Sequence, residues 1–155
     1  MKINQLLKVG LYNLVIVAIL GVIMRYKIGF EFPFLDQKHL QHSHSHFAFT
    51  GWISHTLMVL MILFLENKTK HTANVLTDKY TKILTANLIC AYGMLVSFII
   101  QGYGLISIIF STASLFVACV FAYFYFQDLK RIAKDDLSKN WFKAALFFNV
   151  FSSLG

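Results

Sequence analysis

Residues 105–126 read LISIIFSTASLFVACVFAYFYF, a run of 22 residues without a charged side chain. A helix of about 20 apolar residues spans the roughly 30 Å hydrocarbon core of a lipid bilayer. Three further segments have a similar composition, at residues 9–24, 46–65 and 83–101, and a fifth apolar run begins at Trp141. The sequence therefore predicts an all-α, polytopic transmembrane helical bundle with four complete spans and the start of a fifth.

The composition of the whole chain supports this fold class. Of its 155 residues, 57% are hydrophobic, 16% are aromatic and 14% are charged, whereas soluble domains carry about 25% charged residues. We interpret residues 1–155 as a single membrane domain whose first partner is the lipid bilayer. The net charge of +7 does not indicate a nucleic-acid-binding protein, because the basic residues are scattered at the segment ends.

The fifth apolar run is short. As a helix, residues 142–155 reach only about 21 Å, which is less than the thickness of the hydrocarbon core. We therefore expect the chain to be a fragment of a longer polytopic protein, in which further C-terminal helices complete the bundle. The alternative is a half-inserted helix that is completed by another membrane subunit.

The basic residues predict the orientation of the bundle in the membrane. With the N-terminus inside, eleven of the fourteen basic residues lie on the cytoplasmic side, and only Arg25, Lys27 and Lys38 lie outside. We therefore expect an integral protein of the inner (cytoplasmic) membrane of a bacterium. In this orientation the histidine-rich residues 39–46 face the outer side.

Five of the six histidines lie between residues 39 and 55. If the second helix begins near residue 38, His39, His42 and His46 share one face, and if the segment is extended, His42, His44 and His46 share one face. Either arrangement predicts a candidate site for a transition metal such as Zn²⁺, Cu²⁺ or Ni²⁺. The alternative is a polar collar at the membrane interface that binds no specific ion.

His55 lies nine residues further into the apolar segment, and an ionisable group at that depth indicates a functional site by default. At helical spacing, residues 44, 48, 51 and 55 share a face and read His, Ala, Gly, His, with Trp52 beside them. The small side chains of Ala48 and Gly51 leave a shallow strip through which a flat macrocycle could approach the imidazole. The alternative is that this face packs closely against another helix.

The first two spans together resemble the start of subunit I of the haem-copper oxidases. The segment LLKVGLYNLVIVAILGVIMRYKI (6–28) is similar to the opening helix of that family, and WISHTLMVLMILF (52–64) is similar to its second helix. In the family, a histidine before a Leu- and Met-rich run ligates the low-spin haem, so the resemblance implies that His55 is an axial haem ligand. The family usually has glycine after this histidine, whereas this chain has Thr56.

The resemblance implies a haem-binding membrane protein of respiratory electron transfer, oxidoreductase-like, with an electron-donor protein as a possible partner. The family's second haem ligand and copper ligands lie in later helices, so residues 1–155 lack the helices for a complete active site. Two rival hypotheses remain open. The first is a metal-handling membrane protein that uses the outer histidines, which could also hold an additional metal beside a haem, and the second is a non-catalytic subunit with structural histidines.

Overall fold

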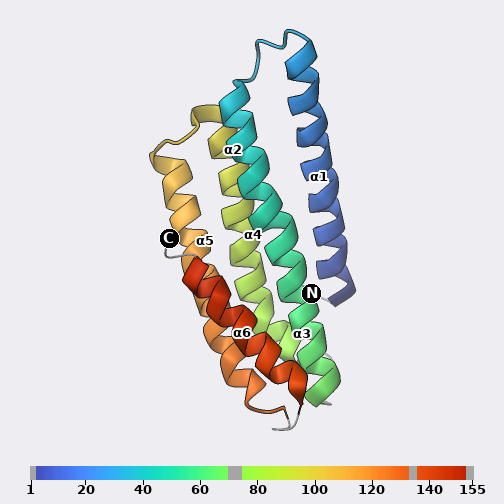
Figure 1. Cartoon of the computed structure of the whole chain (residues 1–155). Coiled ribbons are helices and arrows are strands. Elements are labelled where there is room, and N and C mark those ends of the chain that lie inside the picture. The colour runs from blue at the N-terminus through green and yellow to red at the C-terminus, as the bar shows by residue number, and fades with distance from the viewer. Residues whose placement is uncertain (1–2, 70–74, 133–135, 153–155) are drawn as a thin grey trace.

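The computed structural model describes residues 3–69, 75–132 and 136–152 of the chain. Its elements are α1 (Ile3–Gly29), α2 (Gln37–Phe47), the π-helical segment η1 (Ala48–Ser54), α3 (His55–Thr69), α4 (Val75–Gln101), α5 (Leu105–Leu129) and α6 (Leu137–Ser152). Elements α2, η1 and α3 are continuous and form one helix of 33 residues. Figure 1 shows α1, this long helix, α4 and α5 running along one common direction, while α6 crosses obliquely over the lower part of the bundle.

The structure confirms the all-α fold class. Within the described residues, four helices are long and apolar enough to cross a membrane. They are the helices that contain the four predicted spans, and α6 contains the start of the fifth apolar run. Each helix extends beyond its predicted span at one end or both, because polar residues continue the helix past the apolar core.

The histidine end of the bundle is the end that contains the start of α2 and the turn between α4 and α5. The opposite end, which contains the start of α1, is the N-terminal end (Figure 1). At the histidine end, Asp36 caps the helix, because its carboxylate accepts a hydrogen bond of 2.9 Å from the backbone N–H of His39. This bond lowers the pKa of Asp36. Residues 39–46 are therefore helical, and the extended alternative is wrong.

A tight turn joins α4 to α5, as the segment QGYG (101–104) predicts. Gly102 adopts a positive φ of 61°, which costs glycine nothing. The hydroxyl of Ser107 donates to the carbonyl of Gly102 and accepts from the N–H of Gly104. Further down this hairpin, a Cβ added at Gly93 would lie 2.5 Å from the ring of Phe110, so the glycine is what allows the two helices to approach.

The largest apolar cluster lies towards the N-terminal end. Leu6, Ile62, Leu84 and Tyr125, from four different helices, are buried in it, and α6 adds Phe142 at its edge. The ring of Phe142 lies 4.5 Å from Phe64 and 5.9 Å from Tyr125, measured between ring centroids. These contacts hold α6 across α3 and α5.

Candidate functional site

The centre of the long second helix is a π-helical turn, η1. Segments of π-helix are rare and frequently occur at functional sites. Two fully buried asparagines hold this turn from opposite sides: Asn13 of α1 donates to the carbonyl of Gly51 at 2.5 Å, and Asn87 of α4 donates to the carbonyl of Thr50 at 3.0 Å. Both asparagines lie within apolar segments of the sequence, where an amide could have been a hydrogen-bond partner of His55. They bind the backbone of η1 instead.

His55 is the first residue after η1, and its side chain is completely buried. Its Nε2 lies 3.2 Å from the carbonyl oxygen of Leu6 in α1. Its Nδ1 has no hydrogen-bond partner among the described residues, and neither has the buried hydroxyl of Thr56. The imidazole is therefore oriented by a backbone carbonyl through one nitrogen, and its second nitrogen is free.

Helix α1 covers this face through its glycines. A Cβ added at Gly10 would lie 2.6 Å from the Thr56 hydroxyl and 3.9 Å from the His55 ring, and one added at Gly21 would lie 3.5 Å from the ring of His44. Gly10 and Gly21 are eleven residues apart on α1, and His44 and His55 are eleven residues apart on the second, antiparallel helix. This matched spacing was a signal in the sequence that α1 packs against the His44–His55 face.

The shallow strip expected beside His55 is filled. A Cβ added at Gly51 would meet the ring of Phe47 at 2.8 Å, and the Gly51 carbonyl is occupied by Asn13. Ala48 and Trp52 pack against an apolar cluster around Phe47. In this structure the space beside Gly51 is thus occupied by the Phe47 ring of the same helix, and Ala48 and Trp52 contact the same cluster.

The other histidines of α2 divide between two faces. The rings of His42 and His46 contact Tyr103, with centroid distances of 4.5 and 6.1 Å, and His46 Nε2 lies 3.3 Å from the Tyr103 hydroxyl. His39 lies against Gly102, so these three histidines share the face that helical spacing predicts. His44 points to α1 instead.

This shared face does not form a ligand set for a metal. Among the described residues, no three His, Cys, Asp or Glu side chains come together in a group that could hold a metal ion. The ring of His46 stacks on Phe98 at 4.4 Å, and the His42 ring also lies near Phe98. Three of the four histidines are thus arranged by contacts with α4 and its turn. Only pairs of imidazoles remain for binding an ion.

Two buried carboxylates were missed from the sequence, which placed no Asp or Glu in the spans. Helices α3 and α5 extend far enough to include Glu66 and Asp128, which are only 7% and 2% exposed. Asp128 accepts hydrogen bonds from Lys79 at 2.5 Å and from the Tyr80 hydroxyl at 2.6 Å. Asp128 thereby joins α5 to α4 near the N-terminal end of the bundle.

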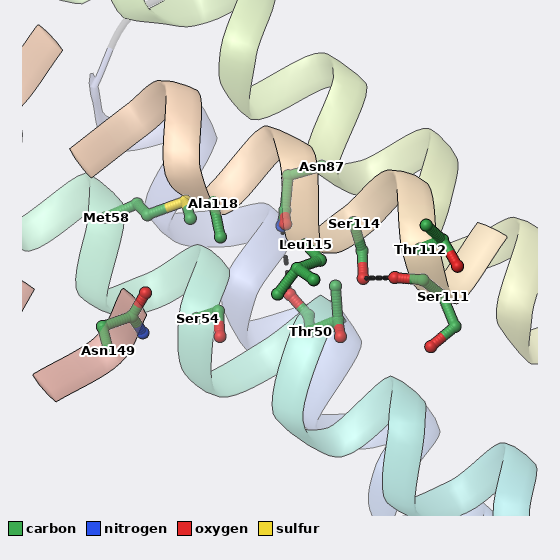
Figure 2. Close-up of a pocket in the computed structure, with 10 residues that line it drawn as sticks. All are labelled: Thr50, Ser54, Met58, Asn87, Ser111, Thr112, Ser114, Leu115, Ala118 and Asn149. Atoms are coloured by element: carbon green, nitrogen blue, oxygen red, sulfur yellow. Dashed lines mark hydrogen bonds between the residues drawn. The ribbon is translucent and has the colours of Figure 1, made fainter. Parts of the chain in front are cut away.

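A polar cavity of about 340 Å³ lies on a different face of the long helix, between η1, α3, α4, α5 and α6 (Figure 2). Its wall contains hydroxyls of Ser54, Ser111 and Ser114 and the amides of Asn87 and Asn149. A stripe of small residues runs along α5 at helical spacing, a pattern typical of close helix packing. Its members Ser111, Ser114 and Ala118 instead line this cavity, which contains none of the histidines in its wall.

Comparisons of the chain with protein-family models, characterised proteins and solved structures found no match. The resemblance to oxidase subunit I therefore rests on the residues of the first two spans.

Proposed function

We propose that this chain is an integral membrane haem-binding protein of respiratory electron transfer, similar to oxidase subunit I, in which His55 is an axial ligand. The observation that carries the proposal is the state of the His55 imidazole. It is 0% exposed within the second span, one ring nitrogen faces a carbonyl oxygen, and the other has no partner among the described residues.

This state of the ring is the one that metal ligation uses. A ligating histidine donates its second N–H to a carbonyl or carboxylate, which fixes the tautomer and the orientation of the ring. The carbonyl of Leu6 supplies that partner here. A buried nitrogen without a partner costs about 1–3 kcal/mol, and coordination of iron would remove this cost. Haem supplies the redox chemistry when bound, and the protein's part is the ligand, its orientation and a dry site.

The donor atom fits a haem, but the space around it does not. Gly10 and Thr56 are in close contact over His55, and Gly51 is filled by Phe47, so no shallow strip is open to a macrocycle. The proposal therefore requires α1 to rearrange near Gly10 while keeping the hydrogen bond between the Leu6 carbonyl and His55.

The experiment is a reduced-minus-oxidised absorption spectrum of the purified full-length protein, expressed with haem available. His55→Ala is compared with the matched control His44→Ala, because His44 also lies against a glycine of α1 and has a buried, partnerless Nδ1. We expect sharp α and Soret bands in the parent and the control, and their loss in His55→Ala. Circular dichroism and gel filtration check that each variant is folded.

Two outcomes would contradict the proposal. Folded parent protein without haem bands would exclude haem binding, and bands that survive His55→Ala would make His55 a structural residue. Metal content, measured in the same samples and in a His42→Ala/His46→Ala variant, tests the rival metal-handling function. Metal lost only in the double variant would favour that rival, and no cofactor in any sample would favour a non-catalytic subunit.

A further inference from the structure

The polar cavity of Figure 2 is lined by residues of the long second helix, α4, α5 and α6. Asn87, in its wall, is 12 residues from the start of α4 and 14 from its end, or about 18 and 21 Å along the helix axis. Asn87 is 1% exposed. Asn87 and the inner part of the cavity wall are therefore far from both ends of the bundle, whereas Ser111 and Thr112 lie only six and seven residues from the start of α5.

The wall of this cavity has hydrogen-bonding groups but no charge. Ser54, Ser111, Thr112 and Ser114 contribute hydroxyls, and the other lining residues are also neutral. The hydroxyl of Ser114 donates to the carbonyl of Ser111 at 2.7 Å, which leaves its oxygen able to accept a bond from the cavity side. An ion would be buried here without a counter-charge, which is costly in a membrane. The cavity therefore selects against charged molecules.

A second cavity of about 140 Å³ continues from the first. The two share Ser54, Met58, Ala118 and Asn149, and the second is bordered mainly by apolar side chains such as Met61 and Phe121. Together they form one space with a polar part and an apolar part. Water alone would satisfy the polar part but not the apolar one, and a lipid acyl chain would leave the hydroxyls without external partners.

We propose that this space is a binding site for an uncharged, lipid-soluble molecule with a compact head and an apolar tail. Its head carries carbonyl oxygens that accept hydrogen bonds from the Ser54 hydroxyl and the neighbouring amide N–H groups, a hydroxyl on the head would donate to Ser114, and its tail lies along Met58, Met61 and Phe121. The size of the space suits this class, since pockets for small molecules begin at about 300 Å³. The site includes Thr50 and Ser54 of η1, so the π-helical turn has a ligand-binding role independent of His55.

The test is equilibrium binding of a tritiated benzoquinone with a decyl chain to the full-length protein in phosphatidylcholine nanodiscs. Unlabelled decylbenzene, which has the same tail but no oxygen, is the competitor control. We expect saturable binding of one probe per chain that decylbenzene does not displace. Ala118→Phe places a ring where the two cavities meet and is expected to weaken binding at least about tenfold. The matched control Val120→Phe, on the exposed side of α5, leaves binding unchanged.

A milder variant keeps the test valid if Ala118→Phe does not fold. Ser54→Ala removes one hydrogen bond, worth about 0.5–1.5 kcal/mol, and is expected to weaken binding about threefold to tenfold. The proposal is overturned by any of three results: no saturable binding, which indicates a cavity that holds only water; equal displacement by decylbenzene, which indicates an acyl-chain groove; or binding that neither variant weakens.

Discussion

Replacing Asp128 with alanine is expected to destabilise the N-terminal end of the bundle, where the end of α5 meets the start of α4. The carboxylate is 2% exposed, and it accepts hydrogen bonds from Lys79 at 2.5 Å and from the Tyr80 hydroxyl at 2.6 Å. Tyr80 is completely buried, so no water can replace its lost acceptor. Lys79 is different, because its side chain is 37% exposed and its ammonium group can turn to solvent.

The magnitude follows from these exposures. A hydrogen bond to a charged group contributes about 1.5–3 kcal/mol, and most of that loss falls on the buried Tyr80 hydroxyl. The half-exposed pairs with Lys79 and Arg131 each add less than about 1 kcal/mol after solvent screening. The free energy of unfolding should therefore fall by about 2–4 kcal/mol. At about 2–4 °C per kcal/mol for a chain of this size, the melting temperature falls by about 4–16 °C.

The assay is thermal unfolding of the full-length protein in detergent, followed by circular dichroism, for Asp128→Ala, Tyr80→Phe and the double variant. Tyr80→Phe alone should be destabilising in the parent, because it removes a satisfied hydrogen bond. In the Asp128→Ala background it should be neutral or stabilising, since it removes a hydroxyl that has lost its acceptor. Equal effects of Tyr80→Phe in the two backgrounds, or a change below about 0.5 kcal/mol for Asp128→Ala, would refute this reasoning.

Three further predictions use the same assay. Gly93→Ala should lower stability by about 1–3 kcal/mol, because the new methyl meets the Phe110 ring, and Phe110→Ala in the same chain should recover part of that loss. Gly102→Ala should lower the free energy of unfolding by about 1–2 kcal/mol, because alanine disfavours the positive φ at this position. A second change at His39, whose ring lies against Gly102, should not recover this backbone loss. The Lys68 ammonium lowers the pKa of Asp136 from its usual 3.8. The ion pair between these two side chains therefore stabilises the fold above that pH, and this stabilisation is lost as the pH falls below it and the carboxylate is protonated. Asp136→Asn should therefore be less stable than the parent at neutral pH and equal to it in acid, and a constant difference would count against the ion pair.

The membrane spans could be predicted because hydrocarbon imposes a requirement on every residue of a segment. A run such as residues 105–126 has no other stable place for its side chains, and composition alone identifies it. The turn at QGYG was predictable for a similar local reason, since glycine permits the backbone that Gly102 adopts. The ends of the helices were less predictable, because residues such as Glu66 and Asp128 continue a helix beyond its apolar part when tertiary partners bury them.

The candidate site was less predictable because it depends on a local departure from regular geometry. The face that aligns His44, Ala48, Gly51 and His55 assumes 3.6 residues per turn, and the chain becomes π-helical between residues 48 and 54. Nothing in the segment AFTGWIS indicates such a turn. Its partners Asn13 and Asn87 come from other helices, so the hydrogen bonds that hold it are visible only in the fold.

The π-helical turn carries polar groups on two faces of one membrane-spanning helix. One face presents His55 to α1, and another presents Thr50 and Ser54 to the polar cavity. Each of these two faces is covered by other helices of the bundle, because polar groups inside a membrane need partners within the protein. The haem proposal and the cavity proposal therefore concern different faces of this helix and can be tested separately. If they are independent, His55→Ala removes haem without weakening binding of the benzoquinone probe, and Ser54→Ala does the reverse. A variant that changes both would mean that η1 transmits the state of one face to the other, because Asn13 and Asn87 hold adjacent carbonyls of the same turn.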